Sequence, residues 1–318
     1  MKAKKIICIA LSIVMLLSTV ALAGCSAQKT TYTVGICQLA PHEALDAATK
    51  GFRDALTEEF GENVTFIEQN AQGDPNTCST IVNDFVNKKV DLIMANATAA
   101  LQAAANATMT IPILGTSITE YGVALNIKDF NGVVGGNVSG TSDLAPLDQQ
   151  AAMLIELFPN AKKVGLLFCS AEANSRYQID VIKAELAKAG LTCTEYSFAD
   201  SNDVAAVATA CAANSDVIYI PTDNTAATCA ETINGAIGKV PVIAGEEGIC
   251  KGCGVASLTI SYYDLGVATG KMAAKILKGE AKVGEMAIEY APATKKYNAD
   301  KCAELNITAP AGYTAMSK

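Results

Sequence analysis

Short apolar runs alternate with amphipathic stretches along most of this 318-residue chain. Runs rich in Val, Ile and Leu between polar loops predict buried strands, and apolar residues three or four positions apart predict helices. Their regular alternation favours an α/β protein with parallel sheets of βαβ units. The predicted strands are Tyr32–Cys37, Val64–Glu68, Asp91–Ala95, Ile111–Gly115, Lys163–Phe168, Thr192–Phe198, Val217–Pro221 and Val240–Ala244. The predicted helices are Glu43–Phe60, Pro75–Asn87, Thr98–Ala107, Leu147–Phe158, Ala173–Ala189, Val204–Ala213 and Thr225–Ile237.

The two halves of the chain repeat one pattern. Asp91–Ile93 leads through a helix to Ile111–Ile113, and Asp216–Ile218 leads in the same way to Val240–Val242. These similar segments occur in the same order in both halves. This order predicts two similar Rossmann-like lobes, each built on its own parallel sheet.

Three segments are predicted to cross between the lobes. They are the glycine-rich Gly132–Thr141, then Ala256–Ser261 and, after a long helix at Tyr262–Lys278, Glu285–Ala291. We expect an N-terminal lobe of residues 32–138 plus 261–283 and a C-terminal lobe of residues 139–260 plus 284–318. Three crossing strands form a hinge about which two lobes close on a ligand.

The first residues are typical of an export signal. A basic start at Lys2, Lys4 and Lys5 precedes an apolar run that closes on Leu22–Cys25. The run is long enough to span a membrane, but it ends in small residues with no basic cluster after it. Leu-Ala-Gly-Cys resembles the bacterial lipobox, which implies removal of residues 1–24, lipidation of Cys25 and a tether over residues 25–31. Such a lipid holds a protein on the membrane without spanning it.

Composition narrows the function further. The leader carries three lysines and no acids, so its removal changes the formal charge of −8 to about −11. An acidic chain without basic clusters is a poor partner for nucleic acid. Nine cysteines remain after Cys8 and Cys25 are set aside, and most lie in apolar patterns, where cysteine packs as a small hydrophobe.

The loops after the predicted strands carry polar residues. Ligands of open α/β sheets bind beyond the carboxyl ends of the strands. Several of these loops run straight into helices, whose free amides attract a carboxylate, while Asp223, Glu246 and Glu247 offer partners for an ammonium group. Together they suggest an amino acid as ligand. The same polar residues are also ordinary helix N-caps, and one residue can serve both roles.

Six motifs resemble the ABC-transporter substrate-binding family that includes the tryptophan- and tyrosine-binding lipoproteins. They are Asn96–Ala100, Gly136–Gly140, Ser170–Ser175, Ile220–Asn224, Ala244–Gly248 and Tyr262–Gly266. The resemblance covers nearly the whole chain after the leader. It implies a type I periplasmic-binding-protein fold and a small ligand, with an aromatic amino acid the leading candidate. It implies ligand contacts from Thr98, Ser170, Asn174, Ser175, Asp223, Asn224 and Glu246.

The resemblance also implies the partners and the location. We expect an extracytoplasmic monomer, anchored through Cys25, that delivers its ligand to an ABC permease with its ATPase. No catalytic residue, metal or cofactor is expected. One loop departs from the family pattern: Thr119-Glu120-Tyr121 stands where relatives usually have Thr-Asp-Pro, and Tyr121 either stacks on a ligand ring or covers the edge of the cleft.

Several alternatives stay open on the residues alone. A Ser-His-Asp enzyme would have to use His42, which is the only histidine. Cys250 and Cys253 have the spacing of a redox pair or half a zinc site, although we expect a tight turn there. The same fold also suits a nucleoside or a sugar, although the chain has no tryptophan to stack on a sugar. It also suits a ligand sensor in place of a transporter subunit.

Overall fold

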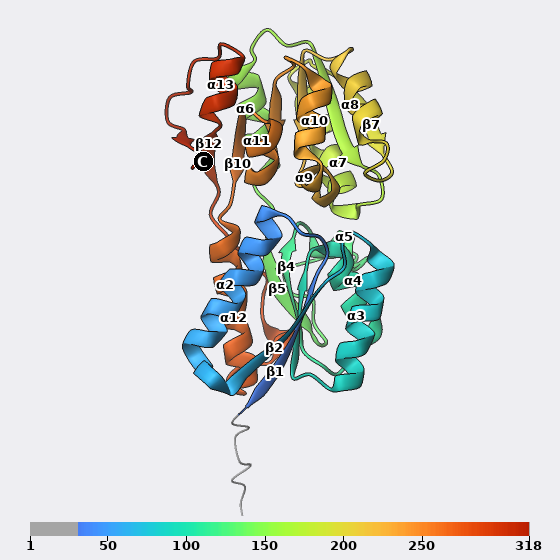
Figure 1. Cartoon of the computed structure of the whole chain (residues 1–318), viewed down its shortest axis with the longest axis vertical. Coiled ribbons are helices and arrows are strands. Elements are labelled where there is room, and N and C mark those ends of the chain that lie inside the picture. The colour runs from blue at the N-terminus through green and yellow to red at the C-terminus, as the bar shows by residue number, and fades with distance from the viewer. Residues whose placement is uncertain (1–30, 318) are drawn as a thin grey trace, which may run out of the picture. The chain divides into compact units, whose positions relative to one another are not determined.

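The computed structural model describes residues 31–317, so the predicted signal peptide, Cys25 and most of the tether lie outside the described residues. Two parallel-dominated sheets organise this part of the chain (Figure 1). We call the elements of the six-stranded sheet the first lobe and those of the seven-stranded sheet the second lobe. Among the described residues, no helix combines the length and the apolar character needed to span a bilayer.

The first lobe has the strand order β11-β5-β4-β3-β1-β2, and every pairing in it is parallel. Its central strands are buried on both faces, which explains their nearly continuous apolar sequences. The strands are β1 Tyr32–Gln38, β2 Val64–Asn70, β3 Leu92–Asn96, β4 Ile113–Ile118, β5 Val138–Ser142 and β11 Glu289–Tyr290. The helices are α2 Glu43–Phe60, α3 Pro75–Lys88, α4 Thr98–Ala107, α5 Tyr121–Ala124 and α12 Tyr262–Leu277, with short 3₁₀ turns at Gly61–Asn63 and Val283–Glu285.

The second lobe has the order β13-β12-β10-β9-β8-β6-β7. Its pairings are parallel except that of β10 with β12. The strands are β6 Lys163–Cys169, β7 Thr192–Phe198, β8 Val217–Ile220, β9 Val242–Ala244, β10 Ala256–Thr259, β12 Thr294–Tyr297 and β13 Thr314–Ala315. The helices are α6 Leu147–Leu157, α7 Ala173–Lys188, α8 Val204–Ala212, α9 Asn224–Thr228, α10 Ala230–Ile237, α11 Glu247–Cys253 and α13 Ala299–Glu304.

The predicted α/β fold with two lobes and three crossings is confirmed, with the crossings shifted. Both β5 and β11 pair within the first sheet, so the chain leaves the first lobe after Ser142 and after Tyr290. These points lie a few residues beyond the expected boundaries at 138 and 283. The second crossing follows Thr259, close to the expected place. The crossing segments are therefore 143–146, 260–261 and 291–293.

One predicted helix is broken. The stretch Thr225–Ile237 forms α9 and α10, which meet at Cys229 with φ −104° and ψ 13°. The Thr228 hydroxyl donates to the Asn224 carbonyl oxygen four residues back, at 2.9 Å. Such side-chain hydrogen bonds to the helix backbone favour bends. The spacing of apolar residues, from which the helix was predicted, does not reveal them.

The helices α2 and α12 lie against each other with their backbones in close contact (Figure 1). A Cβ atom added at Gly51 of α2 would lie 2.1 Å from the Tyr263 carbonyl oxygen, and one added at Gly266 would lie 2.0 Å from the Ala48 carbonyl oxygen. Only glycine permits this approach. The contact fixes the first turn of α12, with Tyr262, beside the first turn of α2 at the cleft.

Candidate functional site

Two neighbouring cavities lie where the carboxyl ends of the two sheets face each other. The larger has a volume of about 390 Å³ and is lined from both lobes, by the loop after β1 and the start of α4 on one side and the starts of α7 and α9 on the other. The smaller has about 10 Å³, room for one water-sized group. Asn174 and Asn224 line both cavities, so the two adjoin.

The start of α4 forms one wall of the larger cavity. No side chain caps this helix, because Ala97 occupies the N-cap position. Ala97 has φ 85° and ψ 161°, a conformation that is favourable only for glycine. The preceding Asn96 is fixed by its amide, which donates to the Leu45 carbonyl oxygen at 2.8 Å and to the Thr49 hydroxyl at 3.0 Å. The surrounding structure thus holds a strained backbone directly before Thr98 and Ala99, which line the cavity.

The start of α7 forms the opposite wall, and it too lacks a side-chain cap. Glu172 occupies its N-cap position, but the carboxylate turns to the next loop. There it accepts hydrogen bonds from the backbone amides of Asn224 and Thr225, at 3.0 and 2.8 Å, and from both of their side chains. Glu172 therefore caps α9 and leaves the amides of α7 to the cavity. A carboxylate ligand is not expected at α9, whose first amides are occupied.

Acidic side chains surround the smaller cavity. Asp223 accepts from the Ala226 amide at 2.8 Å and from the Cys169 amide at 2.7 Å, so it caps α9 and ties it to β6. Glu246 caps α11 through the amides of Gly248 and Ile249. Burial raises the pKa of Glu246 to about 7, and burial together with the charge of Glu172 raises the pKa of Asp223.

Asp143 and Ser117 also line this cavity, and neither was among the expected ligand contacts. Asp143 lies in the first crossing segment, and one of its oxygens accepts the Tyr262 hydroxyl at 3.0 Å. Burial raises the pKa of Asp143 to about 6. Ser117 follows Thr116 in β4 and has a left-handed φ of 56°. No sequence motif marks Asp143, because its place in the cavity depends on where the chain crosses between lobes.

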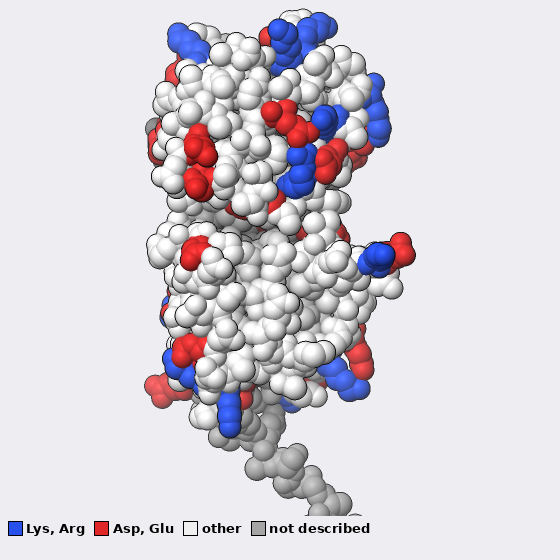
Figure 2. Space-filling view, turned by 90° about the vertical axis from the view of Figure 1, so that its right-hand side faces the viewer, with Lys and Arg blue, Asp and Glu red and all other residues white. Residues whose placement is uncertain are grey.

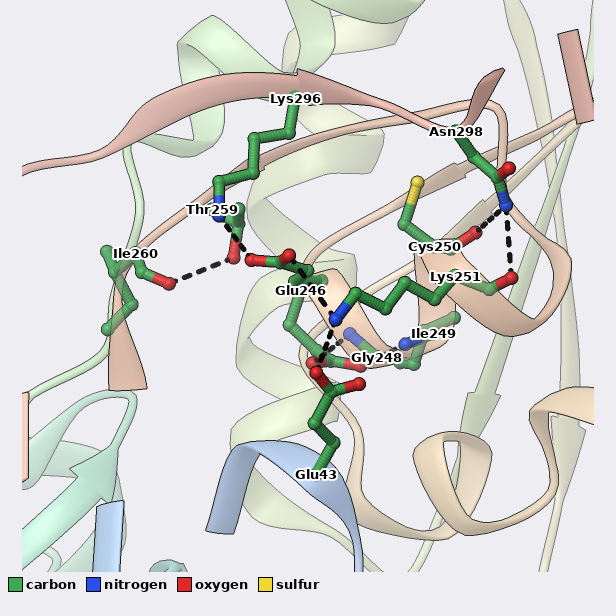
Figure 3. A network of polar contacts seen from close by, with 11 residues as sticks. Glu43, Glu246, Gly248, Ile249, Cys250, Lys251, Thr259, Ile260, Lys296 and Asn298 are labelled. Carbon is green, nitrogen blue, oxygen red and sulfur yellow. Dashed lines mark hydrogen bonds and ion pairs between the residues drawn. The ribbon is translucent and has the colours of Figure 1, made fainter. Parts of the chain in front are cut away.

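Polar contacts join the two lobes beside the cavities. The His42 ring lies 3.3 Å from the Asn224 side-chain oxygen, and Lys251 of α11 forms an ion pair with Glu43 of α2 (Figure 3). Lys251 also lies 3.6 Å from Glu247. Burial lowers the pKa of His42, so the ring is neutral at pH 7. The face shown in Figure 2 carries scattered charges of both signs and no continuous basic area.

The structure brings together most of the residues expected to bind ligand. Thr98, Asn174, Asp223, Asn224 and Glu246 each line one or both cavities.

The other expected positions lie outside the cavity walls. The Ser170 hydroxyl donates to the Phe198 carbonyl oxygen at 3.1 Å. Ser175 is buried, and its hydroxyl oxygen accepts from the side-chain amide of Asn174 at 3.3 Å. Tyr121 neither stacks in the cleft nor covers its edge. Its hydroxyl is buried against the carbonyl oxygens of Gly115 and Thr141, at 3.0 and 3.1 Å.

The rival cysteine motif has a different structure from the expected turn. Cys250 and Cys253 lie in α11, and both are buried free thiols. Burial raises the pKa of Cys253 to about 12 and that of Cys250 well above its usual range, which suppresses the reactive thiolate. Within residues 31–317, no group of three or more His, Cys, Asp and Glu side chains is arranged to hold a metal.

Two lobes, three crossings and a polar cleft at the carboxyl ends of the strands define a solute-binding protein. Residues 33–312 match the family of ABC transporter substrate binding proteins, and the chain belongs to that family. It is therefore a substrate-binding protein and not an enzyme, and its family places it outside the cytoplasm.

Three relatives add detail. A tyrosine-binding protein of Clostridioides difficile (strain R20291) is 36% identical over 265 residues, which span 82% of this chain and 76% of that protein. The solved structure of an ABC domain in complex with L-Trp, from Streptococcus pneumonia, is 32% identical, covers 90% of this chain and 100% of that one, and has a TM-score of 0.85. A ligand-free, open structure of a substrate binding protein with adhesive properties, from Clostridium difficile, is 35% identical and covers 91% of this chain and 100% of that one, with a TM-score of 0.69.

The two solved relatives differ in how closely this chain matches them. The open, ligand-free relative is the more identical in sequence but the less similar in structure. The arrangement of this chain is therefore closer to that of the L-Trp complex. In this arrangement the contacts between Glu43 and Lys251 and between His42 and Asn224 join the two lobes.

Proposed function

We propose that this chain is the lipid-anchored, extracytoplasmic receptor of an ABC importer and that it captures an aromatic amino acid as a monomer. The observation that carries the ligand class is the pair of uncapped helices, α4 and α7, on opposite walls of one cavity. Each presents backbone amides at the positive end of a helix, which suits a ligand carboxylate. The acid-lined cavity beside them suits the ammonium group.

The size and lining of the larger cavity fit this ligand. A volume of about 390 Å³ lies within the usual range of small-molecule sites, about 300–1,000 Å³. Leu39, Pro41 and Pro75 contribute apolar wall on one side, and Ala171 and Ala173 contribute it on the other. The relatives named for tyrosine binding and solved with L-Trp support an aromatic side chain there.

Closure supplies the mechanism of capture. Ligand bound to one lobe gains contacts from the other only in the closed arrangement, so binding shifts the population toward closure. The closed form then docks on the permease, which reopens it. The lipid on Cys25 keeps the receptor near the permease, since anchoring both proteins to one membrane raises the effective concentration of the receptor at the permease.

The test uses the soluble protein from Ser26 onward, freed of co-purified ligand by unfolding and refolding. Each amino acid is added while thermal unfolding is followed, because a ligand that binds only the folded state raises the midpoint. The chain has no tryptophan, so indole emission that co-purifies with it reports bound tryptophan directly. Stabilisation by tyrosine, tryptophan or phenylalanine supports the proposal, and no stabilisation by any of the three contradicts it.

A further inference from the structure

The charge around the smaller cavity is one-sided. Its lining includes the carboxyl groups of Asp143, Asp223 and Glu246 and contains no Lys or Arg. The other titratable groups in the lining are His42, which is neutral at pH 7, and the Tyr262 hydroxyl. A buried cluster of acids without a counter-charge is unfavourable in the protein alone and favours a cation.

The three carboxyl groups are not equivalent. Both oxygens of Asp223 and both oxygens of Glu246 accept backbone amides. Asp143 is 4% exposed, and its oxygen Oδ1 has no hydrogen-bond partner, while Oδ2 accepts from Tyr262. Of the three carboxyl groups, Asp143 in the first crossing segment is therefore the one with an oxygen that lacks a donor.

Ser117 adds a second unsatisfied group. It is 6% exposed, lines the same cavity and has a hydroxyl without a hydrogen-bond partner. Its left-handed backbone is uncommon for a residue other than glycine, asparagine or aspartate. Two buried polar atoms in one cavity, Asp143 Oδ1 and the Ser117 hydroxyl oxygen, lack partners, which indicates that a polar group of a ligand completes the site.

We propose that Asp143 and Ser117 bind the ammonium group of the ligand, so that this receptor selects α-amino acids by a carboxylate in its hinge. The inference rests on the proposed function and assigns the residues that recognise its substrate class. A cavity of about 10 Å³ has room for one water-sized group, which matches an ammonium group and excludes the rest of an amino acid. The remainder of the ligand extends into the adjoining cavity of about 390 Å³, toward α4 and α7.

The position of Asp143 links recognition to closure. Asp143 belongs to the segment between β5 and α6, and its partner Tyr262 begins α12 directly after the second crossing. An ammonium group on Oδ1 therefore neutralises a carboxylate whose other oxygen links the first crossing to the start of α12. Asp223 and Glu246 keep their role as caps of α9 and α11 and shape the cavity wall.

The experiment compares two ligands in four proteins by calorimetry at pH 7.5. The ligands are tyrosine and 3-(4-hydroxyphenyl)propionate, which lacks only the amino group. The proteins are the wild type, Asp143→Asn, Ser117→Ala and the matched control Asp148→Asn, which removes the same charge from an exposed position in α6. Thermal unfolding without ligand shows that each variant is folded.

We expect Asp143→Asn to weaken tyrosine binding about 100-fold or more, because removing one partner of a buried charge pair lowers the binding affinity by a factor of this order. The affinity for the propionate, which has no ammonium group, should stay within about threefold. Ser117→Ala should weaken tyrosine binding about tenfold, and Asp148→Asn should leave both affinities unchanged. Wild-type tyrosine affinity in Asp143→Asn overturns the inference. An equal loss for both ligands also overturns it, since that result describes a structural residue.

Failure of the proposed function is a separate result. If the wild type binds no aromatic amino acid, the same variants are compared with the other amino acids as probes. A 100-fold, ammonium-dependent loss in Asp143→Asn with any of them supports the inference without the aromatic ligand. Binding of only amine-free molecules by the wild type overturns it.

Discussion

Asp143→Asn should make the protein without ligand more stable at neutral pH. In the folded state the pKa of Asp143 is about 6, against an ordinary value of 3.8, and burial is the main cause. A group whose pKa is raised on folding destabilises the folded state above both values, and this penalty disappears as the pH falls below 3.8. The difference between 3.8 and about 6 corresponds to roughly 3 kcal/mol of lost stability at pH 7.5.

An asparagine keeps the shape and an acceptor for the Tyr262 hydroxyl but carries no charge. Its NH₂ group needs acceptors of its own in the cavity, which offsets part of the gain. We therefore expect the free energy of unfolding of Asp143→Asn to exceed that of the wild type by about 1–3 kcal/mol at pH 7.5 and by little at pH 4. Residues such as Asp223 and Glu246 titrate in both proteins, so the difference between the two pH curves isolates Asp143.

The assay is urea unfolding of refolded, ligand-free protein from pH 4 to pH 8. The exposed control Asp148→Asn should change the stability by less than about 0.5 kcal/mol at any pH. A variant that is less stable than the wild type at pH 7.5, or a difference that does not vary with pH, would refute the reasoning. It would show that the Asp143 carboxylate is already compensated in the empty protein.

Three further outcomes are expected. Glu43→Gln removes the ion pair with Lys251 between the lobes. Calorimetry should show ligand binding weakened about two- to fivefold at low salt and unchanged at 1 M salt. The control Glu59→Gln, whose ion pair lies within the first lobe, should show no such loss. Ala97→Gly relieves the strained φ of 85° and should raise the free energy of unfolding by about 1 kcal/mol in urea, and a lower value contradicts the strain. Thiol titration should find nine free thiols in the unfolded soluble protein and reaction of only the two partly exposed cysteines in the folded one, whereas fewer than nine would reveal a disulfide.

The fold was predictable because the signal is repeated and local. Every strand and helix predicted between Tyr32 and Leu277 begins within two residues of its position in the structure. Buried parallel strands need continuous apolar sequence, and the polar residues that end them also begin the next helix. The exceptions are the break at Cys229, the helix α11 where a turn was expected at Cys250 and Cys253, and the later crossings. They depend on contacts that the spacing of apolar residues does not encode.

The candidate site was predictable only as a set of loops. The loops after the strands were correctly placed at one cleft, because parallel strands end at a common edge. Which residues serve the helices and which are left for a ligand depends on where each side chain turns. Glu172 caps a helix in a neighbouring loop, Asp223 and Glu246 are occupied by amides, and Asp143 keeps one oxygen without a partner.

The close contact of α2 and α12 has a mechanical consequence. Their backbones approach so closely at Gly51 and Gly266 that neither helix can slide or tilt without the other. The two helices therefore behave as one rigid unit. His42 and Glu43 lie at the start of α2, and Tyr262 lies at the start of α12 beside them. Residues about 220 positions apart in the chain are therefore held in fixed positions relative to one another at this edge of the cleft.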